Sequence, residues 1–407
     1  MQSIIDSLLT EEVQDFIHSH ENEDVQKLLL KQNMVLGVPT DLIAQQIVGR
    51  KKAKTKINHW YNTRGIIYPP SLSMEQSSSE ATSKFKLALL KNLIQDDEKI
   101  VSAADLTGGL GVDTHALSLR AQHIDYVEPD VTLYEIARHN HKLLNLYNQQ
   151  NISHYNASAE AYLETLDEKI DILFIDPSRR KSTQKVYKLS DCKPDVVKLQ
   201  SEIVNKASYV LIKTSPLMDI QQGLRELKNV SQVVVVAVEN ECRELLFLLQ
   251  ENYSDTPSIR AVELNRYGEV INDASFSLEE EKNSSVSFSA PLAYLYEPSA
   301  AVLKAGAFKG TSEKYKLKKL AVSSHLYTSD EIIEFPGRIF RVVEHVKLDK
   351  NLVDRFANGH ANIITRNYPL SVEEIKKKTG LKEGGEEYLI ATQTDKEKFV
   401  MVAERLK

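Results

Sequence analysis

Residues 105–113 read Asp-Leu-Thr-Gly-Gly-Leu-Gly-Val-Asp, a stretch with an acid at each end and three glycines between them. A short apolar run, 100–104, precedes this stretch, and a helix-like segment, 114–121, follows it. Such a loop needs glycine because a side chain would keep the backbone away from a ligand and would forbid positive φ. The pattern therefore predicts a nucleotide-type ligand site. Its candidate residues are Asp105, Thr107, Gly108, Gly109, Gly111 and Asp113.

Two ligands compete for this loop. A dinucleotide site requires the pattern Gly-x-Gly-x-x-Gly, but Thr114 stands where the third glycine belongs. A site for S-adenosylmethionine (SAM) instead favours an acid at the end of the strand, because the methionine part of SAM carries an ammonium and a sulfonium cation. Asp105 occupies that position. The loop therefore favours SAM over a dinucleotide.

Polar residues also follow the next expected strands. Glu128 lies 23 residues after the first acid of the loop, where a carboxylate can accept both ribose hydroxyls. Asn156 and Ala157 follow a third strand, and the Asn156 amide is expected to read the edge of the adenine. A fourth strand, 170–175, leads into a loop of Asp176, Pro177, Ser178, Arg179 and Arg180. Each feature alone is common, but their order indicates one cofactor site.

These features resemble the class I SAM-dependent methyltransferases, in which the loop after the fourth strand faces the methyl acceptor. The resemblance implies that the Asp176 carboxylate accepts a hydrogen bond from an amine or removes its proton, and that Pro177 aims the loop carbonyls at the same atom. Ser178 and Arg179 replace the second proline and the aromatic ring of the amino-methylating pattern, so no ring stacks on a base. Arg179 and Arg180 suit recognition of phosphate or carboxylate, or alternatively a structural salt bridge.

A basic and aromatic stretch lies nearer the N-terminus. No acid occurs between Asp41 and Glu75, and the stretch mixes cations with rings, namely Arg50, Lys51, Lys52, Lys54, Lys56, His59, Trp60, Tyr61, Arg64 and Tyr68. Cations follow phosphates and rings stack on unpaired bases, so this composition suits RNA. The candidate RNA contacts are Lys51, Lys52, Lys54 and Trp60. The alternative is a helix whose basic face meets an acidic domain or solvent.

The composition favours an intracellular enzyme of several domains. A chain of 407 residues readily buries a core, and its net charge of −6 argues against a uniformly basic nucleic-acid binder. Cys192 and Cys242 lie far apart without metal-ligand spacing, so we expect a reducing compartment, no disulfide framework and no metal. No cationic leader is evident, and the strongly apolar stretch 233–238 is too short to cross a bilayer. The expectation is a cytoplasmic protein that does not engage a membrane.

The expected elements define an α/β protein with a Rossmann-like, seven-stranded, doubly wound sheet. Strands are expected at 100–104, 123–128, 152–156, 170–175, 209–213, 233–238 and 259–264, with a helix over 242–250. Lys213, a candidate catalytic residue at the end of the fifth strand, either pairs with Asp176 or ends in solvent. The prolines and serines of 68–80 indicate either a linker or a loop that closes over the cofactor and brings Gln76 to it.

Four regions are expected along the chain. They are an N-terminal helical region with the cofactor-covering loop (1–80), a class I SAM-dependent methyltransferase domain (81–274) and two α+β units (275–334 and 335–407). The loop 75–82 (Glu-Gln-Ser-Ser-Ser-Glu-Ala-Thr), Tyr-Leu-Tyr-Glu-Pro at 294–298, Lys-Ala-Gly-Ala-Phe at 304–308 and Arg-Asn-Tyr-Pro-Leu-Ser at 366–371 are similar to a bacterial group. Its members join such a domain to a ferredoxin-like domain and a C-terminal THUMP-like domain.

The resemblance to this group implies an acceptor. THUMP domains bind RNA, so the implied function is a SAM-dependent methyltransferase that acts on structured RNA, either rRNA or tRNA, although a fold does not by itself fix a function. Two alternatives stay open. One is a methyltransferase that acts on a small molecule or a protein, and the other is a module that binds SAM or RNA without turnover.

Overall fold

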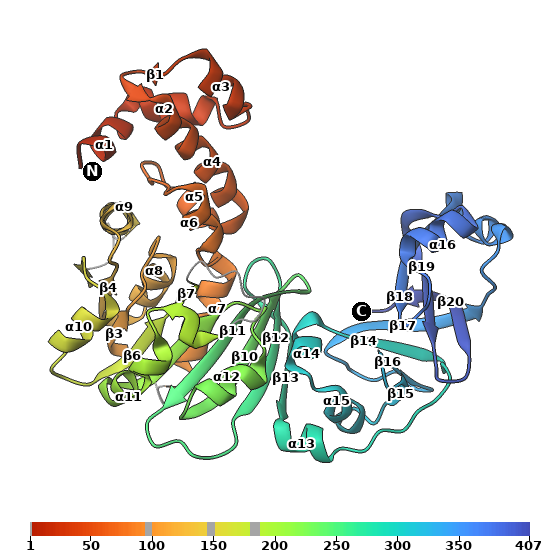
Figure 1. Cartoon of the computed structure of the whole chain (residues 1–407). Coiled ribbons are helices and arrows are strands. Elements are labelled where there is room, and N and C mark those ends of the chain that lie inside the picture. The colour runs from red at the N-terminus through yellow and green to blue at the C-terminus, as the bar shows by residue number, and fades with distance from the viewer. Residues whose placement is uncertain (1, 94–99, 145–150, 180–187) are drawn as a thin grey trace. The chain divides into compact units, whose positions relative to one another are not determined.

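The computed structural model describes residues 2–93, 100–144, 151–179 and 188–407 (Figure 1). The chain divides into two compact units. The first comprises Met1–Val233, Arg243–Asp255 and Leu264–Glu269, and the second comprises Val234–Cys242, Thr256–Glu263 and Val270–Lys407. Among the described residues, no helix combines the length and the apolar content that a membrane span requires.

Helices form the N-terminal region, as its apolar periodicity predicts. Their bounds, with those of a short hairpin, are α1 (Gln2–Leu8), α2 (Glu11–Ser19), α3 (Val25–Lys31), β1 (Met34–Val35), β2 (Val38–Pro39), α4 (Thr40–Lys56), α5 (Asn58–Tyr61) and α6 (Ser71–Gln76). Buried residues of these helices, such as Ile43 and Ile47, form one core with Leu110 and Ile136 of the α/β domain. The helical region therefore packs directly on the α/β domain.

The segment 68–80 is packed structure and not a linker. Residues Ser71–Gln76 form α6, and Tyr68 and Met74 are buried. Gln45 and Gln46 of α4 donate hydrogen bonds to the carbonyl oxygen of Tyr68, at 2.9 and 3.0 Å. The prolines of the segment precede α6, where proline is compatible with the start of a helix. The linker interpretation is therefore wrong.

The α/β domain contains one large sheet. Its elements are α7 (Glu80–Lys91), β3 (Ile100–Asp105), α8 (Val112–Ser118), β4 (Ala121–Val127), α9 (Val131–Leu144), β5 (Ile152–Tyr155), α10 (Ala159–Thr165), β6 (Ile170–Ile175), β7 (Ser178–Arg179), β8 (Cys192–Lys193), α11 (Val196–Lys206), β9 (Ala207–Thr214), α12 (Ile220–Glu226), β10 (Val230–Val238), β11 (Glu241–Gln250), β12 (Ser258–Leu264) and β13 (Val270–Ser277). Within the described residues the sheet has nine strands, two more than expected, in the order β13-β12-β10-β11-β9-β6-β3-β4-β5.

The neighbouring strands β5, β4, β3, β6 and β9 place the polar strand ends at one edge of this sheet. The pairs β3–β4, β3–β6, β4–β5 and β6–β9 are parallel. Parallel neighbours need a crossover, which the helices between them supply. The carboxyl ends of these strands therefore lie at the same edge, with Asp105, Glu128 and Asp176 at or just after the ends of three of them.

The prediction of a helix over 242–250 is wrong, because this segment lies in strand β11. It pairs antiparallel with β9, with Leu245 opposite Thr214. Glu239 and Asn240, which connect β10 to β11, have φ values of 51° and 61°, as in a two-residue type I′ turn. The apolar run 245–249 is buried on both faces of the sheet, so its sequence lacks the alternation that distinguishes a strand from a helix.

A second sheet organises the C-terminal unit. Its elements are α13 (Leu278–Asn283), β14 (Tyr294–Pro298), α14 (Ala300–Ala305), α15 (Phe308–Lys314), β15 (Lys318–Ala321), β16 (Ser324–Ser329), β17 (Gly337–His345), β18 (His360–Arg366), α16 (Val372–Thr379), β19 (Lys382–Gln393) and β20 (Lys398–Arg405). The strand order is β15-β16-β14-β17-β20-β19-β18. The capping box expected for Ser371 and Glu374 is confirmed at the start of α16.

A buried glutamate links distant strands of this second sheet. Glu297 of β14 is 4% exposed and pairs with Arg338 of β17 and, at 2.6 Å, with Arg366 of β18. Because β18 is the last strand in the sheet order, this pair brings the edge of the sheet back towards β14. Residues of β14 to β20, including Leu295, Ile364 and Met401, accordingly share one apolar core.

The structure corrects the role expected for Trp60. Its side chain is 1% exposed, and its ring packs edge-on against His115 and His141, with centroid distances of 5.9 and 6.4 Å. A ring buried in this way offers no face to a nucleic-acid base. The expectation that Trp60 stacks on RNA is therefore wrong, and the residue belongs to the core.

Replacing Trp60 by alanine is expected to lower the free energy of unfolding by about 3–5 kcal/mol, the usual loss for a buried aromatic side chain. Urea denaturation followed by circular dichroism measures this loss. Leu72→Ala is the control, since Leu72 is 64% exposed in the neighbouring helix α6. An equal loss in both variants would contradict the assignment of Trp60 to the core.

Candidate functional site

The glycine loop between β3 and α8 has no room for side chains at two positions. A Cβ atom on Gly108 would lie 2.1 Å from an aromatic ring of β4, and one on Gly111 would lie 2.3 Å from His141 Nε2. Gly111 also has a φ of +86° and immediately precedes α8. A Cβ on Gly109, in contrast, would meet only a backbone carbonyl at 3.8 Å. The loop is therefore fixed against the protein on one side and open at Gly109.

Asp105 lies beneath this loop and is 1% exposed. Its carboxylate accepts hydrogen bonds from Thr107 N at 3.1 Å and from Thr114 Oγ1 at 2.7 Å. Thr114, the residue that departs from the dinucleotide pattern, thus supplies a hydroxyl group to the first acid of the loop. Burial raises the pKa of Asp105 to about 7, and the nearby carboxylate of Asp113 adds to this effect.

Glu128 connects the end of β4 to the glycine loop. Its two oxygens accept hydrogen bonds from Gly109 N at 2.9 Å and Asp130 N at 2.8 Å, and burial raises its pKa. The Asn156 amide nitrogen donates to the carbonyls of Glu128 and Pro129, at 2.8 and 3.2 Å. Asn156 therefore supports the Glu128 turn, and the half-buried Ala157 follows it.

Asp176 begins the loop after β6 and contacts the glycine loop through its backbone. Its amide donates to Thr107 Oγ1 at 2.6 Å, and its Oδ2 atom lies 2.5 Å from Lys213 Nζ. The expected pairing of Lys213 with Asp176 is thus present. Burial opposes protonation of Lys213, but the carboxylates of Asp176, Glu244 and Asp113 outweigh it and raise the pKa of Lys213.

The rest of this loop forms a short β-ribbon. Pro177 is buried, and Ser178 and Arg179 form β7, which pairs antiparallel with Cys192 and Lys193 of β8. The Ser178 hydroxyl is exposed and donates to the Lys193 carbonyl at 3.3 Å. Arg180, a candidate for substrate binding, lies outside the described residues.

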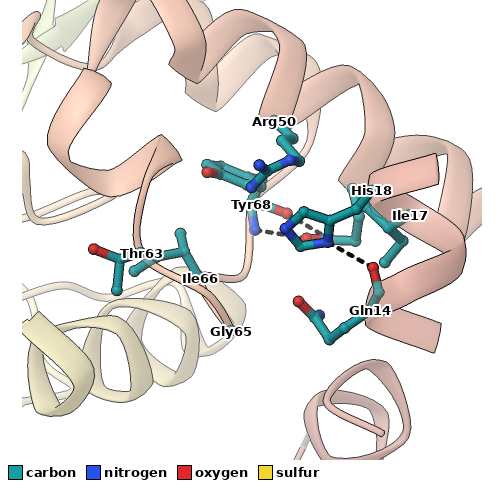
Figure 2. A pocket seen from close by; sticks show the side chains of 9 residues that line it. Gln14, Ile17, His18, Arg50, Thr63, Gly65, Ile66 and Tyr68 are labelled. Atoms are coloured by element: carbon teal, nitrogen blue, oxygen red, sulfur yellow. Dashed lines mark hydrogen bonds between the residues drawn. The ribbon is translucent and has the colours of Figure 1, made fainter. Parts of the chain in front are cut away.

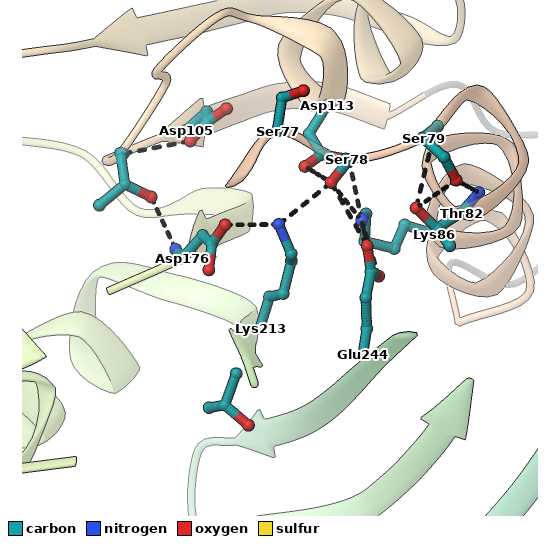
Figure 3. A network of polar contacts seen from close by, with 12 residues as sticks. Ser77, Ser78, Ser79, Thr82, Lys86, Asp105, Asp113, Asp176, Lys213 and Glu244 are labelled. Atoms are coloured by element: carbon teal, nitrogen blue, oxygen red, sulfur yellow. Dashed lines mark hydrogen bonds and ion pairs between the residues drawn. The ribbon is translucent and has the colours of Figure 1, made fainter. Parts of the chain in front are cut away.

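A buried network of charges surrounds these groups (Figure 3). Lys86 of α7 lies 3.0 Å from Asp113 Oδ1 and 2.8 Å from Glu244 Oε2. The Ser78 hydroxyl donates to Asp113 Oδ2 at 2.5 Å and accepts from Lys86 and Lys213, at 2.9 and 3.1 Å. Burial opposes ionisation of Asp113, but the ammonium groups of Lys86 and Lys213 outweigh it and lower its pKa. We call these side chains, together with Asp176, the Ser78 network.

Sequence reasoning missed three members of the Ser78 network. Lys86 lies among the buried residues Phe85 and Leu89 of α7, and a lysine on an otherwise apolar helix face is a signal that could have found it. Ser78 belongs to the loop 75–82 that carries the family resemblance. Glu244 lies in the segment that the sequence predicts as a helix. That prediction gave no reason to expect its side chain near the ends of the strands.

Other predicted site residues lie away from the Ser78 network. Gln76 is exposed at the C-terminal end of α6. Lys52 pairs with Glu75 at 2.5 Å, Lys54 lies 3.9 Å from Glu21, and Lys51 is exposed on α4. The basic stretch is therefore partly neutralised by acids from other helices.

A small cavity lies in the N-terminal region (Figure 2). Its lining residues include Gln14, His18, Gln46, Arg50 and Tyr68, and its volume of about 10 Å³ is roughly the space that one water molecule needs. The Tyr68 hydroxyl is buried and has no hydrogen-bond partner among the residues that the structure describes. The cavity is too small for a nucleotide, so the candidate site remains at the edge of the large sheet.

Two neutral histidines support the glycine loop. His141 Nε2 lies 2.8 Å from the Gly111 carbonyl, and His141 Nδ1 lies 2.9 Å from His154 Nε2. Because a carbonyl only accepts, His141 carries its proton on Nε2 and accepts at Nδ1 from His154. Burial lowers the pKa of His141 to about 3 and that of His154 to about 4. Both rings are therefore neutral near pH 7.

Acid is expected to destabilise the fold through His141. Its pKa is about 3 in the folded protein, whereas an unfolded histidine titrates near pH 6.5. Below pH 6.5 the unfolded chain therefore binds the extra proton, so this contribution to stability is complete above pH 6.5 and is lost as the pH falls. Between pH 7.5 and pH 5 the loss amounts to about 2 kcal/mol.

The variant His141→Gln isolates this contribution, since glutamine keeps a donor but does not titrate. The difference in unfolding free energy between wild type and variant should shrink by that amount from pH 7.5 to pH 5. Asp105, which titrates near pH 7 and has the opposite effect, is common to both proteins and cancels. His345→Gln, at an exposed position, is the control. A constant difference between wild type and His141→Gln would disprove the expectation.

The C-terminal unit matches two family models. A ferredoxin-like domain matches residues 294–336, and a THUMP domain-like family matches residues 337–405. A search of curated proteins gave no significant match. The whole chain is similar to a crystal structure described as a "putative methyltransferase" from Porphyromonas gingivalis W83, with 29% identity, a TM-score of 0.84, and coverage of 100% of this chain and 99% of that one.

Two further solved structures match part of the chain. A structure described as a "putative methyltransferase" from Streptococcus mutans in complex with SAH has 16% identity and a TM-score of 0.31, with 41% of this chain and 97% of that one covered. A structure described as a "putative RNA methyltransferase" from Pyrococcus horikoshii has 14% identity and a TM-score of 0.34, with 48% of this chain and 97% of that one covered. The full-length match and the two domain matches show a class I methyltransferase fold joined to a ferredoxin-like and a C-terminal THUMP-like domain.

Proposed function

We propose that the protein is a cytoplasmic SAM-dependent methyltransferase whose acceptor is structured RNA, either rRNA or tRNA. The observation that carries the proposal is the direct contact among three loops at one edge of the sheet. Gly109 N donates to Glu128, and Asp176 N donates to Thr107 Oγ1. A ligand held over the glycine loop would therefore lie between a group suited to ribose and the loop that suits an acceptor.

The charges around the glycine loop favour SAM over a dinucleotide. Asp105 lies beneath the loop, and Asp113 lies in the first turn of α8. The Asp113 carboxylate, together with the ionised fraction of Asp105, whose pKa is about 7, repels the pyrophosphate that a dinucleotide would place at this helix start, whereas it attracts an ammonium or a sulfonium. Both oxygens of Asp105 accept hydrogen bonds, and both oxygens of Asp113 are engaged, by Lys86 at 3.0 Å and by the Ser78 hydroxyl at 2.5 Å. A carboxylate has about four lone-pair sites, so either acid can still accept from the methionine ammonium.

The remaining groups suit the nucleoside. Each oxygen of Glu128 uses one lone pair for a backbone amide and keeps another for a ribose hydroxyl. The Asn156 amide nitrogen is already bound, so its carbonyl oxygen and the Ala157 backbone are the groups left for adenine. When bound, SAM supplies an activated methyl group, and the protein has to align the acceptor and exclude water.

Asp176 has the geometry to orient the acceptor. Lys213 occupies its Oδ2 atom at 2.5 Å and keeps its own charge, so Asp176 is held as a carboxylate. The other oxygen can then accept a hydrogen bond from an N–H or O–H group and turn the lone pair of that group towards the methyl donor. Burial raises the pKa of Asp176 although the Lys213 ammonium opposes this shift, so removal of a proton from the acceptor stays open beside orientation.

Positive charge next to the site supports an anionic acceptor such as RNA. Lys56 donates to the carbonyls of Met74 and Glu75 at the end of α6, at 2.8 and 2.6 Å. Burial, together with the charges of Lys213 and Arg243, lowers the pKa of Lys56 to about 8. A phosphate group would relieve this repulsion. The THUMP-like match is the second support, because domains of that type bind RNA.

A small-molecule or protein acceptor is the second candidate, and one observation favours it. Cations of the basic stretch are paired with acids, with distances of 2.9 Å for Arg50–Glu21 and 2.8 Å for Arg64–Asp15. Paired cations attract a polyanion less strongly than unpaired ones. Salt-dependent association with RNA separates the two candidates, and product formation separates both from a module that binds without turnover.

Isothermal titration calorimetry is expected to show that the purified protein binds SAM. Glu128→Gln should weaken this binding by about 1.5–3 kcal/mol, because a carboxylate that accepts from ribose forms a charge-assisted hydrogen bond. Glu135→Gln, the same change at the surface pair with Arg138, should have no effect. Equal affinity of wild type and Glu128→Gln for SAM, or tight binding of NADH, would overturn the cofactor assignment.

RNA purified from the native host is expected to bind with an affinity that falls as salt rises. Replacing Lys51 and Lys54 by alanine should flatten the slope of log affinity against log salt by about 0.7–0.9 for each phosphate that is no longer neutralised. SAM binding should stay unchanged, since both lysines lie on α4 and outside the glycine loop. Lys169→Ala combined with Lys198→Ala removes two exposed lysines of the α/β domain as a control. Absence of salt-dependent binding by the wild type would leave the second candidate favoured.

A further inference from the structure

The Ser78 hydroxyl has no hydrogen-bonding capacity left. It donates its proton to Asp113 Oδ2 at 2.5 Å and accepts from Lys86 Nζ at 2.9 Å and from Lys213 Nζ at 3.1 Å (Figure 3). A hydroxyl group offers one donor and two acceptors, so all three are used. Ser78 is also 4% exposed. Glu244 Oε1, at 3.4 Å, is a longer alternative acceptor for the same proton, so every hydrogen bond of this buried hydroxyl is to a charged group.

This arrangement brings two like charges together. Both ammonium groups lie about 3 Å from the same oxygen, so their nitrogens are at most about 6 Å apart. Lys86 is balanced by Asp113 and Glu244, at 3.0 and 2.8 Å. Lys213 has Asp176 as its ion-pair partner within 4 Å among the described residues. Lys213 therefore has fewer ion-pair contacts than Lys86, although the carboxylates of Glu244 and Asp113 also act on its charge from further away. The oxygen of Ser78 offsets part of the repulsion between the two ammonium groups.

We propose that Ser78 is a positioning residue that holds Lys213 against Asp176 and so fixes the carboxylate of the acceptor loop. The proposal rests on the proposed function for the role of Asp176. It gives a function to one residue of the segment 68–80, for which the sequence predicts either a linker or a loop that closes over the cofactor. Ser78 reaches the acceptor side of the site through Lys213 and the cofactor side through Asp113.

The backbone of the Asp176 loop has its own support. Asp176 N is held by Thr107 Oγ1, and this contact does not involve Ser78. Lys86 likewise remains paired with Asp113 when the hydroxyl is removed. Loss of Ser78 should therefore release the Lys213 side chain while the glycine loop keeps its shape. This asymmetry separates a positioning role from a general packing role.

Lysine labelling with acetic anhydride, read by mass spectrometry, tests the proposal on the whole chain. In wild type, Lys213 should react slowly because it is buried and charged. In Ser78→Ala, the reaction of Lys213 should rise about tenfold relative to exposed Lys51, with Lys86 changed far less. Ser77→Ala is the matched control, since the Ser77 hydroxyl donates to the Met74 carbonyl, at 2.9 Å, and not to the network. Ser78→Thr keeps the hydroxyl and should restore slow labelling.

Two further measurements complete the test. Transfer of tritiated methyl groups from SAM to RNA of the host should fall about tenfold in kcat for Ser78→Ala, with the KM for SAM within about threefold of wild type. If Ser78→Ala does not fold, Ser78→Cys, whose sulfur is a weak acceptor, is measured in the same way.

The possible outcomes separate the two proposals. Unchanged labelling of Lys213, or an equal rise at Lys86 and Lys213, overturns the role of Ser78. A wild-type protein that does not bind SAM overturns the proposed function, whereas the labelling result still decides whether Ser78 positions Lys213.

Discussion

The α/β domain depends on pairing each charged side chain that it buries with a group of opposite charge. Burying an isolated ion costs several kcal/mol, and removing one partner of a buried pair typically costs about 3–5 kcal/mol. Lys86 and Lys213 meet this constraint only because three carboxylates, those of Asp113, Asp176 and Glu244, are brought to them. The carboxylates come from α8, the end of β6 and β11, so the charge balance is satisfied only when the sheet is complete.

The distribution of these charges bears on the ligand of the site. Asp113 lies at the glycine loop, whereas Lys56, whose charge interacts with those of Lys213 and Arg243, adds positive charge beside α6. Negative charge at the loop suits a cationic group there, and positive charge beside it suits an anionic group. The placement of the charges therefore discriminates between ligands that a glycine loop alone would accept.

The sequence predicts the parts of this site that are local. The glycine loop, Glu128 and Asp176 each follow a strand, and the order of strands along the chain is enough to bring them to one edge. The pairing of Lys213 with Asp176 was also foreseeable, since both lie at ends of adjacent parallel strands. Ser78 and Glu244 were not, because each comes from an element whose local pattern is that of an ordinary loop or buried strand, and Lys86 has only the signal of a charge on an apolar helix face.

Composition was least informative where partners are distant in sequence. The basic stretch contains no acid, yet Glu21, which lies 29 residues before Arg50, forms an ion pair with it and accepts from the Tyr61 hydroxyl. Trp60 likewise has the sequence context of a surface aromatic among cations, but its neighbours in space are His115 and His141. Burial of this kind depends on how helices pack, which a window of neighbouring residues does not contain.

The junction between the two C-terminal domains has an implication for how they are inherited. The family models meet between residues 336 and 337, but β14 on one side pairs antiparallel with β17 on the other, from Tyr294–Arg341 to Pro298–Gly337. At this seam a Cβ on Gly337 would lie 2.2 Å from the Glu297 carbonyl, so the two backbones are in direct contact. Separating the domains would expose a long strand edge on each fragment, and unpaired edges promote aggregation. Recombination at this boundary would therefore be selected against, and the ferredoxin-like and THUMP-like domains should evolve as a single module.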